Sequence, residues 1–150
     1  MERLPPPEKA ALSKVITHGV RHISRHNQFE FDVHKLIQLT QESPETMVSV
    51  TDFLDDLKDT NWVDDNDCVV SPQEVINVYR AAGSAEAAIV AHPELSSHIK
   101  KIVGADYSSP VLVFESRVID GMHRFVKAML DGQTLIKARV IEKIPTEAII

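Results

Sequence analysis

The chain of 150 residues has a single cysteine, Cys68, and no long apolar run. One thiol excludes an internal disulfide, and a zinc site that used it would need histidines to complete the ligand set. No apolar stretch approaches the roughly 20 residues of a membrane-spanning helix, and the N-terminus lacks the apolar stretch of a secretory signal. These absences predict a protein of the reducing cytoplasm with no membrane partner.

The sequence also lacks a surplus of basic residues. Its net charge is −6, and residues 52–67 account for all of it with seven aspartates and one lysine. The last fifty residues are close to neutral, with seven Lys or Arg and six Asp or Glu. Binding to duplex DNA through its phosphates is therefore disfavoured, although a local basic pocket for nucleic acid stays compatible with this charge.

Length and composition, with 43% hydrophobic and 25% charged residues, are typical of one compact domain. The expected elements alternate between helix and strand. Helices are expected at 8–18, 33–41, 51–57, 72–82, 93–103 and 122–130, and strands at 46–50, 68–70, 111–114, 118–119 and 134–144. The clearest helix start is Ser71, Pro72 and Glu74, which fit a capping box with proline at N1. Residues 20–30 have no clear period and are expected to be a linker or frayed helix.

The segment most informative about function is Asp120-Gly121-Met122-His123-Arg124, which follows an expected strand and opens an expected helix. Helix-start N–H groups point outward with the positive end of the dipole behind them, which favours an anion. Gly121 permits close approach to the backbone, Arg124 offers a forked cation for phosphate oxygens, and His123 can donate a hydrogen bond or a proton. Asp120 can cap the helix, orient its neighbours or ligate Mg²⁺.

A purely structural interpretation of this segment is also open. Asp120 is then an N-cap, Gly121 a turn residue, and His123 and Arg124 a solvated first turn. Against it, a basic pair in the first turn opposes the helix dipole, at a cost that an anionic ligand would relieve.

Residues 118–143, VIDGMHRFVKAMLDGQTLIKARVIEK, resemble the strand, Asp-Gly-x-His-Arg turn, helix, glycine and strand signature of the ParB/sulfiredoxin superfamily. The resemblance is greatest to its short stand-alone proteins similar to ParB N-terminal domains. It extends to residues 105–106 and 110–114, and more loosely to 46–57. It implies an α+β fold, with a small mixed sheet flanked by helices over residues 45–150. Residues 1–44 are then an N-terminal helical extension, which the resemblance does not cover.

In this superfamily the glycine and the His-Arg turn hold nucleotide phosphates with Mg²⁺. Its members include CTP-hydrolysing partition proteins, ATP-dependent sulfiredoxins and free serine kinases. The resemblance implies that Gly121, His123 and Arg124 bind the phosphates, and in the leading hypothesis the N–H groups at Gly121 and Met122 cradle one of them. It also implies that Asp120 matches the acidic position of the kinase-like branch, so that Asp120, His123 and Arg124 are the catalytic candidates and Asp120 the metal ligand.

Two departures from the superfamily limit what is expected. Met122 stands where sulfiredoxins carry their reactive cysteine, so sulfinic acid reduction is not expected. Partition proteins continue into a helix-turn-helix region, whereas this sequence continues for only eleven residues after Arg139. Site-specific partition activity is therefore not expected.

Further candidates lie before the 111–114 strand. In related proteins this segment flanks the phosphate pocket, so His98, Lys101 and Asp106 are candidates to position a substrate or act as base and phosphate clamp, Asp106 foremost. The alternative is that Lys101 is a solvated helix charge and His98 a surface residue. Phosphoryl transfer also needs a general base, commonly a carboxylate. The sequence offers three candidates for the base, with no way to choose among them: Glu45, Glu74 and Glu94. Three other residues are candidates to extend the basic patch at Arg124: Lys127, Lys137 and Arg139.

Two other clusters have a metal interpretation and a simpler one. His18, His22 and His26 recur every four residues, a spacing that places imidazoles on one helix face. Gly19 interrupts that helix and adjacent arginines repel a cation, which favours a solvated basic arm. The acidic run at 64–67 lacks the glycine and distal glutamate of a calcium loop, which favours an exposed acidic loop.

The leading hypothesis is a nucleotide-phosphate-binding protein, either a Mg²⁺-dependent NTPase or a small phosphotransferase, with ATP or CTP as the nucleotide. The alternative is a non-catalytic module that uses the same turn to sense a nucleotide or to bind nucleic acid or a protein partner. A homodimer is compatible with both.

Overall fold

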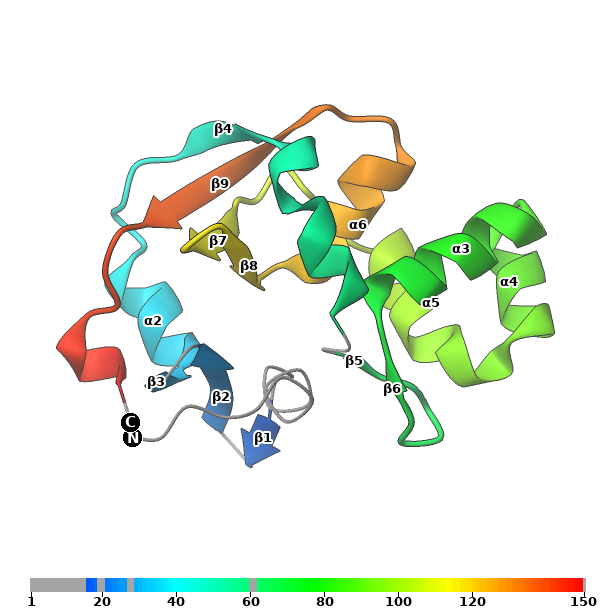
Figure 1. The fold of residues 1–150 in the computed structure, drawn as a ribbon, viewed down its shortest axis with the longest axis horizontal. Helices are drawn as coiled ribbons and strands as arrows, with labels where there is room; N and C mark the ends of the chain where they lie inside the picture. The colour runs from blue at the N-terminus through cyan, green and yellow to red at the C-terminus, as the bar shows by residue number, and fades with distance from the viewer. Residues whose placement is uncertain (1–15, 19–20, 27–28, 60–61, 150) are drawn as a thin grey trace.

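A computed structural model describes residues 16–18, 21–26, 29–59 and 62–149 (Figure 1). At its centre is a four-stranded sheet in the order β4-β9-β7-β8. Its strands are β4 (Thr46–Ser49), β7 (Val111–Phe114), β8 (Arg117–Asp120) and β9 (Leu135–Ile141). β9 is antiparallel to β4 and parallel to β7, and β7 is antiparallel to β8. The protein is therefore of the α+β class with a small mixed sheet.

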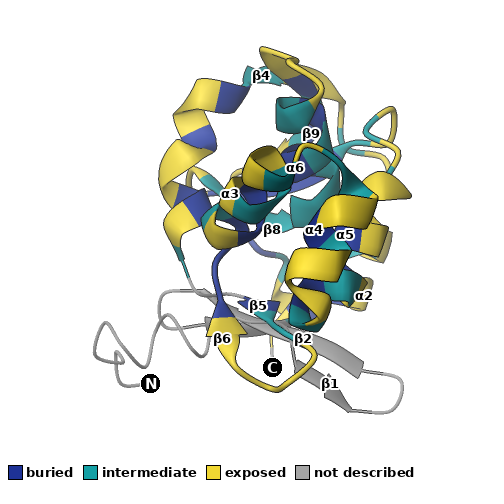
Figure 2. Cartoon of the chain, turned by 90° about the vertical axis from the view of Figure 1, so that its right-hand side faces the viewer, coloured by how far each residue is buried: buried dark blue, intermediate teal, exposed yellow. Residues whose placement is uncertain are grey.

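Helices cover both faces of this sheet (Figure 1). One face packs against η1 (Val50–Lys58) and α6 (Met122–Leu130), and α3 (Pro72–Ala82) and α5 (Ser96–Val103) pack in turn against these helices. The apolar sides of all four form the larger core. The inner sides of α3, α5 and α6 are buried and their outer sides exposed (Figure 2). Two short helices, α4 (Ala85–Ala91) and η2 (Pro93–Leu95), connect α3 to α5.

A second apolar cluster lies on the opposite face of the sheet. It joins α2 (Val33–Leu39) and η3 (Thr146–Ala148) to β7 and β9. The fully buried Val33 and Leu36 of α2 pack there with Leu112 and Phe114. Residues 33–39 therefore belong to the same packed unit as the sheet. Among the described residues, no helix has the length and apolarity to cross a bilayer.

The N-terminal region is not the helical extension expected from the sequence. β1 (Ile16–His18), β2 (Arg21–His26) and β3 (Phe29–Asp32) form a three-stranded antiparallel sheet. The helix expected at 8–18 ends in strand, and its earlier residues lie outside the described ones. Residues expected to be linker form β2 and β3. The signal that points to a strand is the period-two alternation Phe29-Glu30-Phe31, which basic neighbours obscure.

The helical metal arrangement of His18, His22 and His26 is wrong for the same reason. His18 lies on β1 and the other two on β2, and the β1–β2 register pairs His18 with Arg21. The three residues therefore do not lie on one helix, which the metal interpretation required.

Most of the other expected elements are confirmed. Asp32 caps α2 by accepting the Lys35 N–H at 3.1 Å. The capping box of α3 is complete, with Ser71 and Glu74 each accepting the other's N–H at 3.1 and 3.2 Å. The helix expected at 51–57 is a 3-10 helix that begins earlier, at Val50. The strand expected at 68–70 is the two-residue β6 (Val69–Val70), which pairs with β5 (Trp62–Val63).

A buried carboxylate joins η1 to the edge strand β8. Asp56 is 7% exposed, and its Oδ2 accepts the Val118 N–H at 2.7 Å. Its Oδ1 lies 3.3 Å from Nε of Arg117, which also donates through Nη2 to Asp59 at 2.7 Å. Burial raises the pKa of Asp56, while the Val118 hydrogen bond and the Arg117 charge oppose that rise. Asp56 thus fixes the strand that leads into the candidate site.

Replacing Asp56 tests this link. Asp56→Ala leaves the Val118 N–H and one side of Arg117 without their acceptor, so we expect a loss of about 2–3 kcal/mol in the free energy of unfolding. Asp55→Ala is the control in the same helix, because Asp55 is exposed and its carboxylate lies 4.0 Å from the exposed Lys58. Urea unfolding of both variants measures the difference, and equal effects would contradict the structural role.

Candidate functional site

The turn between β8 and α6 has a backbone that only glycine adopts readily. Gly121 is the N-cap of α6 with φ +95° and ψ 25°, and its carbonyl accepts the Phe125 N–H at 2.9 Å. A Cβ at this position would lie 2.9 Å from Cγ1 of the buried Val111. Packing against the central strand therefore requires this glycine, whether or not a ligand approaches. Gly121 also has no side chain to cap the first N–H groups of α6.

The Arg124 side chain contacts the two segments that precede α6, at Pro110 and Asp120. Its Nη1 donates to the Pro110 carbonyl at 2.5 Å, and its Nη2 lies 3.5 Å from Oδ2 of Asp120. The Arg124 side chain is 28% exposed. A guanidinium carries five N–H donors, so donors remain for a ligand after these two contacts.

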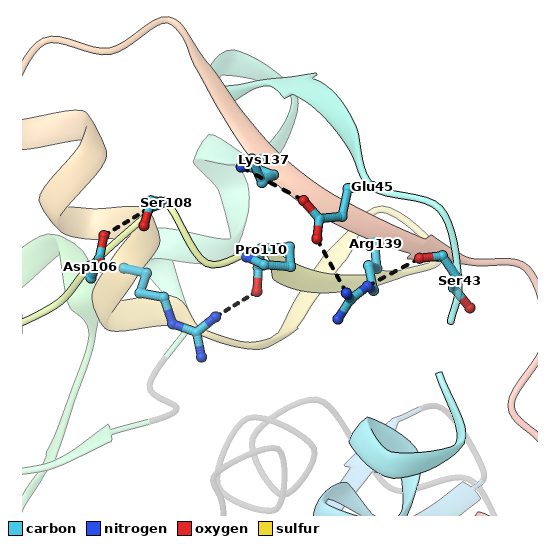
Figure 3. Close-up of polar contacts among 8 residues, drawn as sticks. Ser43, Glu45, Asp106, Ser108, Pro110, Lys137 and Arg139 are labelled. Atoms are coloured by element: carbon cyan, nitrogen blue, oxygen red, sulfur yellow. Dashed lines mark hydrogen bonds and ion pairs between the residues drawn. The ribbon is translucent and has the colours of Figure 1, made fainter. Parts of the chain in front are cut away.

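Asp106 lies in an exposed turn just before Pro110 (Figure 3). Its Oδ1 accepts the Ser108 N–H at 3.0 Å, and hydrogen bonding to Ser108 lowers the pKa of Asp106. The charges of Lys127 and Arg124 lower that pKa further. An ionised carboxylate only accepts hydrogen bonds, so Asp106 can hold a ligand hydroxyl or a metal ion but not a phosphate oxygen.

Two histidines far apart in the sequence meet beside the turn. His98 of α5 is 7% exposed, so it is not the surface residue of the simpler interpretation. Its Nδ1 lies 3.0 Å from Nε2 of His123, and its Nε2 lies 2.7 Å from the Val63 carbonyl oxygen. Trp62 stacks on both rings, with centroid distances of 4.4 Å to each and interplanar angles of 11° and 8°.

This environment keeps both imidazoles neutral. Burial lowers the pKa of His98. Burial, then the charge of His98, then that of Lys101 lower the pKa of His123 to about 3. Lys101 itself is exposed on α5. The structure thus brings His98, Lys101 and His123 together.

The other charged candidates are engaged elsewhere. Lys127 donates to the carbonyls of Val103 and Ala105 at 2.8 and 2.9 Å, where α5 ends. Figure 3 shows Glu45 between Lys137 and Arg139, apart from the Asp106 turn. The Glu45 carboxylate lies 3.7 Å from Nζ of Lys137 and 3.2 Å from Nη2 of Arg139. Lys137 and Arg139 therefore do not extend the Arg124 patch, whereas the charge of Lys127, like that of Arg124, acts on Asp106. The remaining carboxylates considered as bases are also held, Glu74 in its capping box and Glu94 at 3.2 Å from His92.

Residues that sequence reasoning missed complete the site. Trp62 and Val63 hold the histidine pair, and Pro110 and Val111 hold the turn. Trp62 is the sole tryptophan and interrupts an acidic run, which predicts burial but not its partners. Its contacts come from tertiary packing, for which no local spacing gives a signal.

A metal could bind here only with help from its ligand. Within the described ranges, no group of three or more His, Cys, Asp or Glu side chains is arranged to hold a metal ion. Asp120 supplies a single carboxylate, which suits Mg²⁺ carried mainly by phosphate oxygens and water. In the run at 64–67, Oδ1 of Asp64 accepts the N–H groups of Asn66 and Cys68 at 2.8 and 3.0 Å, and the loop is mostly exposed.

Comparisons with known proteins do not assign the site. No protein-family model, no curated protein and no solved structure matches this chain. The proposals below rest on the sequence and geometry of the chain itself.

Replacing Gly121 tests the fit of the turn against β7. In Gly121→Ala the positive φ and the contact with Val111 together should lower the free energy of unfolding by about 2–4 kcal/mol. Gly132→Ala, just beyond the other end of α6, is the control because its φ is +82° with nothing within 4 Å of the added Cβ. The free energy of unfolding of Gly132→Ala should fall by only about 1 kcal/mol. Chemical unfolding compares the two, and equal losses would contradict the close contact.

Acid should destabilise the protein through the histidine pair. The folded-state pKa of His123, about 3, lies below its usual value of about 6.5. As pH falls, the unfolded chain therefore binds a proton at His123 before the folded protein does. The stability that the folded protein has above about pH 6.5 is lost as the pH falls below that value. Between pH 7 and pH 5 the loss from His123 should be about 1–2 kcal/mol. Urea unfolding at both pH values should show a smaller loss in His123→Gln but an unchanged loss in the exposed control His92→Gln. An equal pH dependence in wild type and His123→Gln would refute this assignment.

Proposed function

We propose that the β8–α6 turn binds the phosphates of a nucleoside triphosphate, ATP or CTP, with Mg²⁺. The protein would then act as an NTPase or small phosphotransferase. The observation that carries this proposal is the start of α6, where no N-cap side chain is present and the cations of Arg124 and Lys101 lie close by. N–H groups at a helix start together with a guanidinium form a favourable site for phosphate oxygens.

Each residue of the turn has a distinct role in this proposal. The N–H groups of Met122 and His123 hold a phosphate, and the free donors of Arg124 neutralise the charge that develops on it. Bound Mg²⁺ would bridge phosphate oxygens and neutralise their charge. Asp120 would hold that ion, and its 3.5 Å contact with Arg124 is loose enough to be exchanged for it. Asp106 would contact a hydroxyl of the ligand.

One observation favours the non-catalytic alternative. The three carboxylates considered as general bases, Glu45, Glu74 and Glu94, all hold structural contacts. Without a base the same turn would bind a nucleotide and not turn it over, as a sensing module does. Binding and turnover must therefore be measured separately.

Titration calorimetry with Mg·ATP and Mg·CTP tests the proposal. Arg124→Ala should weaken binding about 10- to 100-fold, because a charged hydrogen bond contributes about 1.5–3 kcal/mol. Arg124→Lys should recover only part of this, since lysine keeps the charge but not the fork. Arg80→Ala, an exposed arginine of α3, is the control. Thermal unfolding checks that each variant is folded.

Phosphate release on the same samples then separates the two functions. Turnover that depends on Arg124 supports the enzyme, and binding without turnover supports the sensing module. Absence of binding in the wild-type protein, or full binding in Arg124→Ala, would exclude the proposed site.

A further inference from the structure

We propose that His98 and His123 form a proton-accepting pair in which Nδ1 of His123 takes a proton beside the first turn of α6 and His98 takes over the positive charge. The pair is then the general base for the reaction at the β8–α6 turn. This inference rests on the proposed function, because it supplies the base that phosphoryl transfer needs.

Hydrogen bonding fixes which nitrogen of each ring carries the proton. The Val63 carbonyl can only accept, so Nε2 of His98, at 2.7 Å, must be the donor. A neutral His98 then has an unprotonated Nδ1, which accepts at 3.0 Å from Nε2 of His123. A neutral His123 with its proton on Nε2 has an unprotonated Nδ1. The chain of contacts therefore leaves one free lone pair, on Nδ1 of His123.

That lone pair belongs to a residue of the candidate phosphate site. Nδ1 is bonded to Cγ and is the ring nitrogen nearer the backbone of its own residue. His123 is the second residue of α6, so its ring is attached to the first turn, whose N–H groups form the candidate phosphate site. Among the described residues, no hydrogen-bond partner of His123 Nδ1 is found. The basic nitrogen and the phosphate-binding groups thus belong to the same turn of helix.

Stacking on Trp62 holds the two imidazole rings nearly parallel. The His98 and His123 centroids are 5.3 Å apart with 13° between the ring planes, and the indole lies 4.4 Å from both. Trp62 is 8% exposed, so this arrangement is part of the packed core. A pair held this way needs little reorganisation to pass a proton from one ring to the other.

Surrounding charges favour His98 as the final carrier of the proton. The Val63 hydrogen bond and the acidic Asp65 and Asp64 raise the pKa of His98, against burial and Lys101, which lower it. For His123 every contribution lowers the pKa: burial, His98 and Lys101. Alone, His123 is a weak base. Passing the Nε2 proton to His98 moves the charge toward the aspartates and lets the pair accept a proton that His123 cannot keep.

Proton transfer to His123 accompanies attack of the acceptor on the γ-phosphate. The acceptor is a hydroxyl, either water or an alcohol, whose O–H proton goes to Nδ1 of His123 as its oxygen bonds to the γ-phosphorus. The bond from that phosphorus to the bridging oxygen breaks, and its electron pair leaves on the nucleoside diphosphate. His123 passes its Nε2 proton to Nδ1 of His98, and solvent later takes the surplus proton from the pair. Neither an oxidant nor a reductant is needed.

Imidazole nitrogen NMR of the full chain tests the proton positions without any ligand. Long-range ¹H–¹⁵N spectra of the ¹⁵N-labelled protein would be recorded from pH 8 to pH 5, with His98→Asn and His123→Gln to assign the signals. At pH 7 and above we expect both rings to be neutral with the proton on Nε2. A proton on Nδ1 of His123, or a charged ring at pH 7, would overturn the proposal.

Single-turnover phosphate release from saturating Mg·ATP tests the catalytic role. His123→Gln keeps an N–H donor for His98 but removes the basic nitrogen, so the rate should fall about 100-fold or more. Nucleotide affinity should stay within about threefold. His98→Asn keeps an acceptor for His123 and should both slow the reaction and shift its pH profile. His92→Gln, an exposed histidine, should leave the rate unchanged.

The outcomes separate the two proposals. Full activity in His123→Gln with intact binding would refute the base and leave nucleotide binding standing. Wild-type protein that binds Mg·ATP but never releases phosphate would also refute the base and favour the sensing module. Wild-type protein that binds no nucleotide would refute the proposed function, and the base would fall with it.

Discussion

The packing of Gly121 against Val111 sets the position of every residue in the candidate site. Val111 begins β7, the strand that pairs with both β8 and β9, and is fully buried. With no Cβ at residue 121, the chain leaves β8 and enters α6 directly over this strand. That entry places Arg124 against Pro110 and His123 against His98. A larger residue at the turn would shift the start of α6 and separate all of these contacts together.

The acidic run at residues 52–67 also has a structural role that its composition does not show. Asp56 and Asp59 bind Arg117 and fix β8, which leads into the turn. Farther along, Asp65 accepts the Ser97 N–H at 3.3 Å, so the loop after β5 is attached to the start of α5. The same loop brings Trp62 and Val63 to the histidine pair. Several aspartates of the acidic run thus hold the elements that position the candidate site.

What could be predicted from the sequence is local. The capping box of α3 and the β8–α6 turn depend on residues within four positions of one another, and both are present, although Gly121 and not Asp120 is the N-cap of α6. The pairing of His98 with His123 spans 25 residues, and that of His98 with Val63 spans 35. No periodicity encodes such contacts, since packing of α5 against α6 and the approach of β5 to α5 create them. The strands at 16–32 were missed for a different reason, because basic residues mask their alternation.

The structure changes the reason for expecting an anion at the turn. From the sequence, a basic His-Arg pair opposed the helix dipole, and a ligand was needed to relieve that cost. In the fold, the low pKa of His123 makes it neutral, and Arg124 is held by Pro110 and Asp120. Little repulsion is left to relieve. The case for phosphate therefore depends on unfilled N–H groups and on nearby cations, while the neutrality of His123 is what makes it available as a base.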